Sequence, residues 1–157
     1  MKYQVITATL TARTGAHIGS GKDSDLTDAL VRRDADNRPF IPGTAIAGSL
    51  RSLLTRLAPR LNAGLCAVLK KEIADRKKSC NCGVCHLFGD VNPSDEDMAM
   101  SEASKLLVFN ARSIGFLPRQ LIRDGVGINR MTGTAARADA VKFDMEVLPP
   151  GAEFELR

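Results

Sequence analysis

The chain has 157 residues, 44% of them hydrophobic and 25% charged, which is ordinary for one globular domain that can bury a core. Its net charge of +4 is a mild indication of a polyanionic partner. The sequence contains no long apolar run and no apolar segment typical of a secretory signal. We therefore expect no membrane span and a cytoplasmic location.

The N-terminal part is predicted to contain a strand followed by a loop. Polar and apolar residues alternate over residues 3–12, as is typical of a strand. The next stretch, TGAHIGSGKDSD, is rich in glycine and small polar residues and is predicted to be a loop. Residues 28–33, DALVRR, are predicted to be a short extended segment.

Three carboxylates, Asp23, Asp25 and Asp28, lie in and just after this loop. One interpretation is a solvated acidic loop. The other is a carboxylate beside an RNA phosphodiester, where it would act as a general base on a 2′-hydroxyl or hold Mg²⁺. The residue pattern leaves both interpretations open.

A helix is predicted over residues 45–57, with the Thr44 hydroxyl as its N-terminal cap. Its apolar residues recur at helical spacing and are expected to form one stripe. The stripe consists of Ile46, Leu50, Leu53, Leu54 and Leu57.

The start of this helix is built from small residues. Gly43 stands before it, and Gly48 and Ser49 follow in its first turns. Exposed N–H groups and small side chains would let a phosphate approach closely, with the charge of Arg51 one turn further on. A tightly packed helix start would use the same residues, so this alternative stays open.

Three of the four cysteines lie within six residues, in the stretch CNCGVCHLFGD. Thiolates suit zinc, and Cys80, Cys82 and Cys85 would supply three ligands of a tetrahedral site. Cys66 or His86 would be the fourth; Cys66 is favoured because His86 directly follows Cys85, and adjacent residues usually point apart. Idle buried cysteines are the alternative. A site with four protein ligands has no open position for water, so we expect a structural zinc ion.

The second half is predicted to contain two strands separated by a long, basic excursion. Residues 105–114 are typical of a strand, and residues 151–157 begin another that would need a partner strand. The segment between them, rich in Gly and Arg, would be a hairpin that is either a nucleic-acid arm or a solvated surface. Ile128 and Met131 would separate bases in the first case, because aromatic residues are nearly absent there.

Five ordered motifs make the chain resemble one family. TGAHIGSG, the Asp-bearing loop, RPFIPGTAIAGSLRSLL, CNCGVCHLFGD and INRMTGTA follow one another between residues 14 and 135. They are similar to the hallmarks of the RAMP superfamily, in particular of the backbone subunit of type III CRISPR effector complexes of the Csm and Cmr type. The resemblance implies an α+β fold, a modified RNA-recognition motif of ferredoxin type with a zinc-bearing insertion and a thumb hairpin.

The resemblance also implies RNA-binding residues. The helix that follows IPG would contact the backbone of a CRISPR guide RNA, and the residues carried over to that role are Gly43, Thr44, Gly48, Ser49 and Arg51. The thumb hairpin would interrupt the duplex between guide and target, and the residues assigned to that region are Arg123, Asn129, Arg130, Met131 and Thr132. His17, in the loop before the candidate Asp, would also contact RNA.

Cutting members of the family cleave target RNA with an Asp and a divalent metal. The stretch DALVRRD aligns with theirs, so Asp28 is the candidate catalytic residue, with Mg²⁺ or another divalent metal as a cofactor beside structural Zn²⁺. Thr27 departs from the isoleucine that the motif usually has before the Asp. The implied partners are a CRISPR guide RNA, complementary target RNA and other CRISPR effector subunits.

The resemblance implies more chain than these residues hold, because the family continues with a further helix, strand and glycine-rich loop. We expect residues 1–157 to form a single incomplete domain, with the zinc insertion at about 58–90 and the thumb at about 114–147. A fragment, or a second chain supplying the missing C-terminal part, would explain the difference. The competing hypotheses are a subunit that binds guide RNA without cutting and, outside the family, a small zinc-stabilised basic interaction protein.

Overall fold

The computed structural model describes most of the chain, namely residues 3–25, 27–62, 66, 80, 82–90, 102–115, 121–135 and 142–157. The chain divides into two compact units. Unit 1 consists of Met1–Pro42 and Asn110–Arg157, and unit 2 of Gly43–Phe109. Unit 1 is built on a sheet, whereas unit 2 has a core around its cysteines.

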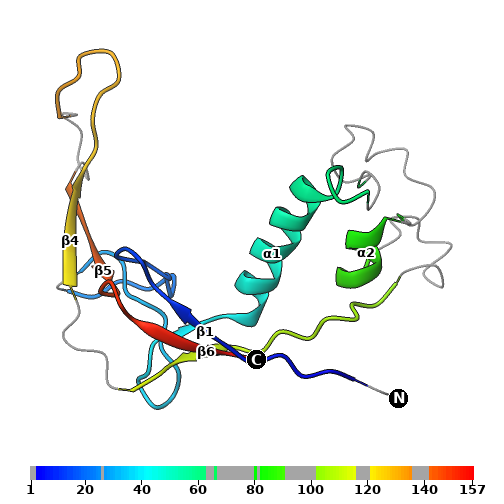
Figure 1. Cartoon of the computed structure of the whole chain (residues 1–157). Helices are drawn as coiled ribbons and strands as arrows, with labels where there is room; N and C mark the ends of the chain where they lie inside the picture. The colour runs from blue at the N-terminus through cyan, green and yellow to red at the C-terminus, as the bar shows by residue number, and fades with distance from the viewer. Residues whose placement is uncertain are drawn as a thin grey trace, which may run out of the picture. The chain divides into compact units, whose positions relative to one another are not determined.

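Unit 1 contains a four-stranded antiparallel sheet with the strand order β1-β6-β3-β2 (Figure 1). Its strands are β1 (Ala8–Thr11), β2 (Phe40–Ile41), β3 (Ala111–Ser113) and β6 (Glu153–Leu156). Phe154 of β6 pairs with Leu10 on one side and with Ser113 on the other, so β6 lies inside the sheet. Helices together with an antiparallel sheet confirm the predicted α+β class.

Phe154 is a central residue of the core of this sheet. It is 2% exposed, whereas Glu153 and Glu155 on either side are exposed, which is the alternation of a half-buried strand. The other buried apolar residues of unit 1 are Val31, Ala111, Val147, Leu148 and Ala152. The core is thus mainly aliphatic, as the low aromatic content implied.

Two strands are shorter than their sequence patterns predicted. Only Ala8–Thr11 of residues 3–12 and only Ala111–Ser113 of residues 105–114 form strands. The reason lies in the partner strands: β1 has four paired positions on β6, and β3 pairs with β2 at Ala111 and Arg112 and with β6 at Arg112 and Ser113. Alternation predicts which residues suit a strand, but a strand extends only as far as its partner.

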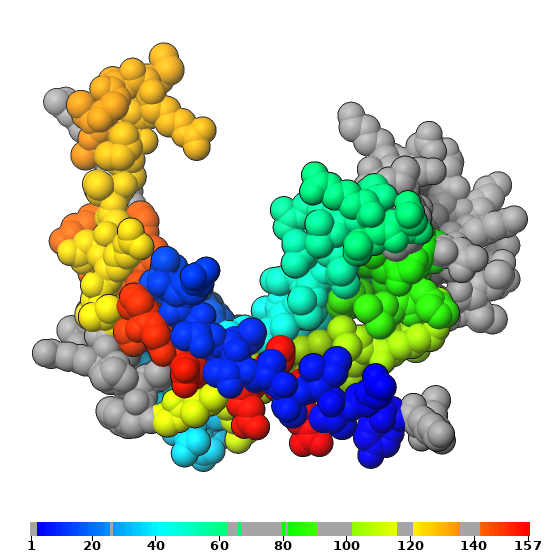
Figure 2. Space-filling model, in the orientation of Figure 1, coloured from blue at the N-terminus to red at the C-terminus, as the bar shows by residue number. Residues whose placement is uncertain are grey.

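β4 (Leu121–Val126) and β5 (Lys142–Val147) form a separate two-stranded antiparallel ribbon in unit 1, the predicted hairpin. Gly125 lies opposite Phe143, and a side chain at position 125 would overlap the phenyl ring. Glycine therefore lets the ring lie across β4. The ribbon (β4 yellow) and the loop that follows β4 (orange) can be followed in Figures 1 and 2.

Unit 2 contains α1 (Gly43–Leu57) and the short helix α2 (Gly83–Phe88). The predicted start of α1 is wrong by two residues: Thr44 lies inside the first turn and is not the cap. Gly43 is the first residue of α1, and it lies so close to the backbone of Val108 and Phe109 that any side chain there would collide with it. No helix in the described part of the chain has the length and apolar character needed to cross a bilayer.

The predicted apolar stripe of α1 divides in the structure. Leu54 packs against the cysteine core, and Ala58, just after the helix, is buried in it. Leu50 and Leu53 are instead 38% and 46% exposed. The side of α1 that is buried in unit 2 is therefore set by the position of the cysteines, which helical spacing alone does not reveal.

Candidate functional sites in the two units

Strand β5 holds the segment that carries Asp28; the loop after β1 runs beside it in Figure 1. Ala29 forms a parallel bridge with Met145, and the Glu146 N–H donates to the Ala29 carbonyl oxygen at 2.9 Å. The Asp144 N–H donates to Asp28 Oδ2 at 2.8 Å. The backbone of β5 thus fixes one carboxylate oxygen of Asp28, while the residue stays exposed to solvent.

Thr27, the residue directly before Asp28, is buried. Its N–H donates to the Ser24 hydroxyl at 3.1 Å, and the Ser24 N–H donates to the Thr27 carbonyl oxygen at 2.9 Å. Asp28 therefore lies between two fixed residues: Thr27 before it is hydrogen-bonded to Ser24, and Ala29 after it is hydrogen-bonded to β5.

Glu146 is a buried acidic residue that the sequence analysis missed; it is only 4% exposed. Its carboxylate accepts hydrogen bonds from the Val31 N–H at 2.7 Å and from the Arg33 guanidinium at 2.8 Å. Its carbonyl oxygen accepts one from His17 Nδ1 at 2.7 Å. A buried carboxylate needs such partners, and both of its own come from the segment that follows Asp28, whereas His17, which bonds the carbonyl oxygen, precedes Asp28. The only sequence signal was a glutamate at the apolar end of KFDMEVL.

Asp28 lines an open hollow of about 470 Å³ in unit 1, called here the Asp28 hollow. The residues lining it are His17, Gly19, Gly21, Lys22, Asp23, Asp28, Ala29 and Leu30. The structure thus brings Asp28 and His17 to one depression together with a second carboxylate, Asp23. Carboxylate oxygens are the ligands that Mg²⁺ prefers, so this donor set fits such an ion.

The loop at the end of the ribbon, residues 127–135, is organised by Asn129. Its side-chain oxygen accepts hydrogen bonds from the N–H groups of Met131 at 2.8 Å and Thr132 at 3.3 Å, and its carbonyl oxygen accepts one from Gly133. Met131 is 94% exposed, and Arg130 is exposed beside it. Asn129 therefore shapes the loop, while Arg130 and Met131 are presented to solvent.

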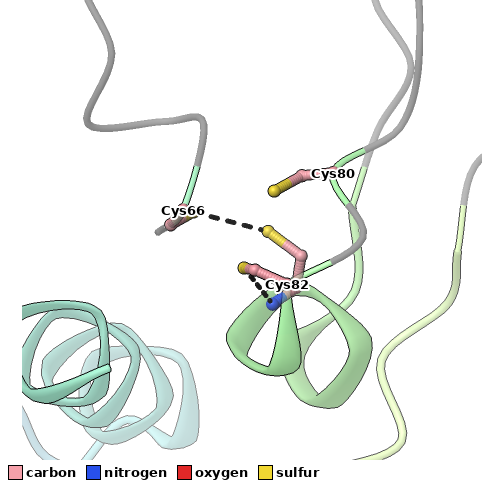
Figure 3. A group of neighbouring side chains, drawn as sticks. Cys66, Cys80 and Cys82 are labelled. Atoms are coloured by element: carbon pink, nitrogen blue, oxygen red, sulfur yellow. Dashed lines mark hydrogen bonds between the residues drawn. The ribbon is translucent and has the colours of Figure 1, made fainter. Parts of the chain in front are cut away.

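The four cysteines of unit 2 form one cluster; Figure 3 labels three of them. The sulfur atoms of Cys66, Cys80, Cys82 and Cys85 all lie within 4.8 Å of one another, and those of Cys66 and Cys85 are 3.6 Å apart. None forms a disulfide. Four zinc–sulfur bonds of about 2.3 Å in a tetrahedron hold the sulfurs about 3.8 Å apart. The cluster is therefore consistent with a structural zinc site.

The surroundings of Cys85 would change its chemistry with and without a metal ion. Burial raises the pKa of the Cys85 thiol far above its ordinary value, and hydrogen bonds with Cys66 and Cys82 raise it further. A bound zinc ion would instead keep the sulfur deprotonated. The Arg51 guanidinium donates to Cys85 Sγ at 3.5 Å and would stabilise a thiolate there.

His86, the alternative fourth ligand, makes its contacts elsewhere. Its Nδ1 lies 2.8 Å from the Glu102 carboxylate, which also accepts a hydrogen bond from Lys105 at 2.8 Å. The Lys105 hydrogen bond lowers the pKa of the Glu102 carboxyl below its ordinary value. The geometry thus joins Cys66, and not His86, to the other three cysteines.

Gly89, in the stretch LFGD, ends α2 with a φ of 83° and a ψ of 164°, a backbone conformation that is essentially restricted to glycine. A Cβ atom there would lie 2.8 Å from the Glu102 carbonyl oxygen and from the Ser104 nitrogen. The neighbouring Asp90 N–H donates to the same Glu102 oxygen at 2.8 Å. Glycine lets these two segments meet directly after the cysteines.

We expect Gly89→Ala to lower the free energy of unfolding by about 2 kcal/mol or more, because backbone strain of about 1–3 kcal/mol adds to the clash. Urea denaturation would measure it. Gly48→Ala is the matched control, since no described atom lies within 4 Å of a Cβ built there. Alanine favours a helix by about 1 kcal/mol over glycine, so the control should be as stable as the native chain or more so.

The glycines at the start of α1 have different surroundings. Gly43 is buried against residues 108–109, and this close packing explains why the residue is a glycine. Gly48 faces open space within the described residues, although glycine inside a helix costs about 1 kcal/mol. Thr44 and Ser49 are exposed, and Arg51 is half-buried towards Cys85. An exposed surface of small side chains therefore remains along the first turns of α1.

Comparison with known families agrees with the motifs described above. The chain is a member of the RAMP superfamily, whose family model matches residues 9–157. A curated relative is the protein named "CRISPR system Cms endoribonuclease Csm3" from Methanothermobacter thermautotrophicus, which is 34% identical over 98 residues. The similarity covers 59% of this chain and 36% of that protein. The chain thus spans only about a third of the length of this relative.

Proposed function

We propose that this chain acts as a backbone subunit of a type III CRISPR effector complex, in which it binds guide RNA and cleaves complementary target RNA. The similarity to an endoribonuclease named Csm3 supports the class of complex. The observation that carries the proposal is the geometry of Asp28: an exposed carboxylate at a solvent-open hollow, with one oxygen held at 2.8 Å by the Asp144 N–H. The other effector subunits, and a chain that completes the domain, are the proposed protein partners.

In the proposed reaction, Asp28 takes the proton of a target 2′-hydroxyl. The 2′-oxygen then attacks the adjacent phosphorus to form a 2′,3′-cyclic phosphate, and the 5′-oxygen of the next nucleotide leaves and takes a proton from water. The bond from Asp144 orients the carboxylate, and Oδ1 of Asp28 has no protein partner among the described residues. Asp23 and Asp28 would hold a divalent ion, which supplies charge stabilisation at the phosphate when it is bound.

The proposed RNA contacts use the exposed surfaces described above. The small side chains of α1 at Thr44, Gly48 and Ser49 let the guide backbone approach. The loop of the ribbon presents Met131 as an apolar wedge and Arg130 as a phosphate contact. Arg123, exposed on β4, adds a further cation along the ribbon. In this proposal the zinc cluster stabilises unit 2 and takes no part in the chemistry.

Asp28→Asn tests the proposal. The amide keeps the size of the side chain and an oxygen for the Asp144 N–H, but it neither takes a proton at neutral pH nor carries charge for a metal. We expect the single-turnover cleavage rate of target RNA in the assembled complex to fall by a factor of about 10² to 10⁴. The affinity for target RNA should stay within about twofold of the native complex, or rise slightly as repulsion of the phosphates is removed.

Asp25→Asn is the matched control, because Asp25 is an exposed carboxylate three residues away that does not line the Asp28 hollow. It should cut at the native rate. Native cleavage by Asp28→Asn would reject the catalytic role. A native complex that binds target RNA in Mg²⁺ without cutting it would instead establish the alternative, a non-catalytic guide-RNA-binding subunit.

A further inference from the structure

A second hollow adjoins the Asp28 hollow in unit 1. It has a volume of about 580 Å³, and we call it the basic hollow because Lys22, Arg32 and Arg33 line it together with Phe40. Lys22 and Leu30 line both hollows. A strand that lies along one of them can therefore continue into the other without leaving the surface.

The charges in the basic hollow are not fully compensated. Arg33 is paired with the buried carboxylate of Glu146 at 2.8 Å. In the part of the chain that the structure describes, neither Lys22 nor Arg32 forms an ion pair with a carboxylate. The Arg32 Nε donates to the Gly19 carbonyl oxygen at 3.3 Å, which helps to orient the guanidinium group. Two cations thus remain available to an anion.

We infer that the basic hollow binds the phosphate next to the linkage that Asp28 cleaves, so that Lys22 and Arg32 position the target strand. The inference rests on the proposed function, because it takes the strand in the Asp28 hollow to be RNA. A guanidinium group can bind two phosphate oxygens at once, whereas the lysine acts as a point charge. Phe40 and Leu30 supply apolar surface for the adjoining nucleoside.

The location of the cations favours this role over that of a solvated basic face. Cations that serve only solubility are as well placed on a convex surface, where water screens them. These two line a depression that shares Lys22 and Leu30 with the hollow of the candidate catalytic carboxylate. Cations in a concave site raise the local concentration of an anionic substrate more than the same charges on an open surface do.

The test uses the assembled complex and a fluorescein-labelled single-stranded RNA complementary to its guide. Binding is measured in the Asp28→Asn background so that the RNA stays intact. We expect Lys22→Ala and Arg32→Ala each to raise the Kd by roughly tenfold at low salt. Each should also reduce the slope of log K against log salt by about 0.7, the value for one phosphate contact with a single strand.

Arg38→Ala is the matched control: it removes one positive charge from an exposed residue of a nearby turn that does not line either hollow. Its Kd and slope should stay near those of the parent. With Asp28 restored, Lys22→Ala and Arg32→Ala should cut more slowly at RNA concentrations below the Kd, in proportion to their loss of affinity, whereas Arg38→Ala should cut at the native rate.

The inference is overturned if the double variant Lys22→Ala/Arg32→Ala gives the Kd and slope of Arg38→Ala while its thermal unfolding is unchanged. That result leaves the proposed function intact as long as Asp28→Asn abolishes cleavage. Conversely, cleavage at the native rate by Asp28→Asn rejects the catalytic proposal whatever the salt slopes are. The two failures are therefore distinguishable.

Discussion

In the proposed zinc site, replacing Cys85 by serine should abolish zinc binding and unfold the cysteine core of unit 2. Cys85 is completely buried, and its sulfur lies within 4.8 Å of the other three. Among the described residues of unit 2, the buried members of that core are Cys66, Cys82 and Cys85 with Ala58 and Val84, so three of these five are candidate metal ligands and the core should depend on the metal ion. Structural zinc contributes about 10 kcal/mol or more in small domains, so the loss of one ligand should exceed the effect of any ordinary core substitution.

Zinc content by mass spectrometry and amide hydrogen exchange would measure the outcome. We expect fast exchange in α1 and α2, while the amides of β6 in unit 1 keep their protection. His86→Ala is the control, since His86 is bound to Glu102 outside the cluster; it should retain one zinc ion per chain. A Cys85→Ser chain with a full complement of zinc would contradict the four-cysteine site, and so would loss of zinc from His86→Ala.

Glu146→Ala should give the second large effect, a loss of about 3–5 kcal/mol in the free energy of unfolding. Removing one partner of a buried ion pair costs this much, and the loss should lie near the lower end of the range because the Arg33 side chain is 20% exposed. Here the Arg33 guanidinium loses its carboxylate, and the Val31 N–H loses its acceptor. Urea denaturation followed by circular dichroism would measure the change. Glu146→Gln keeps an oxygen for Val31 and should cost less.

Glu155→Ala provides the comparison for Glu146. Glu155 is an exposed glutamate on β6, and an exposed substitution of this kind changes stability by no more than about 0.5 kcal/mol. If Glu146→Ala were as stable as Glu155→Ala, the paired carboxylate would not hold the segment around Asp28. Glu146→Gln tests positioning separately: where it folds fully, its cleavage rate should fall while its Kd for target RNA stays unchanged.

Sequence patterns predicted the features that depend on residues close together in the chain, namely one strand and most of the cysteine cluster. The alternation in EFEL predicted β6, and the spacing of Cys80, Cys82 and Cys85 predicted three members of the cluster. Glu146 escaped prediction because its partners, His17, Val31 and Arg33, lie more than a hundred positions away in the chain. A short sequence motif cannot reveal a contact between residues that lie so far apart in the chain.

The two helix glycines illustrate the same limit. In the sequence, Gly43 and Gly48 are equivalent candidates for close approach of a phosphate. Packing against residues 108–109 explains why position 43 is a glycine, whereas no such packing explains the glycine at position 48. Strand length could not be predicted for the same reason, since β1 extends only as far as its pairing with β6, and β3 only as far as its pairing with β2 and β6.

The interior position of β6 has a consequence for biosynthesis. Ala8 pairs with Leu156, and β6 also pairs with β3, so the sheet of unit 1 cannot close until the ribosome has translated the codons of Glu153–Leu156. The residues of unit 2 emerge earlier, so the cysteine cluster can form before β1 has its partner strand. Pairing between segments so distant in the chain is slow to form. We therefore expect nascent chains stalled before codon 150 to be readily degraded by proteases within residues 3–25, yet to resist them within α1 and α2.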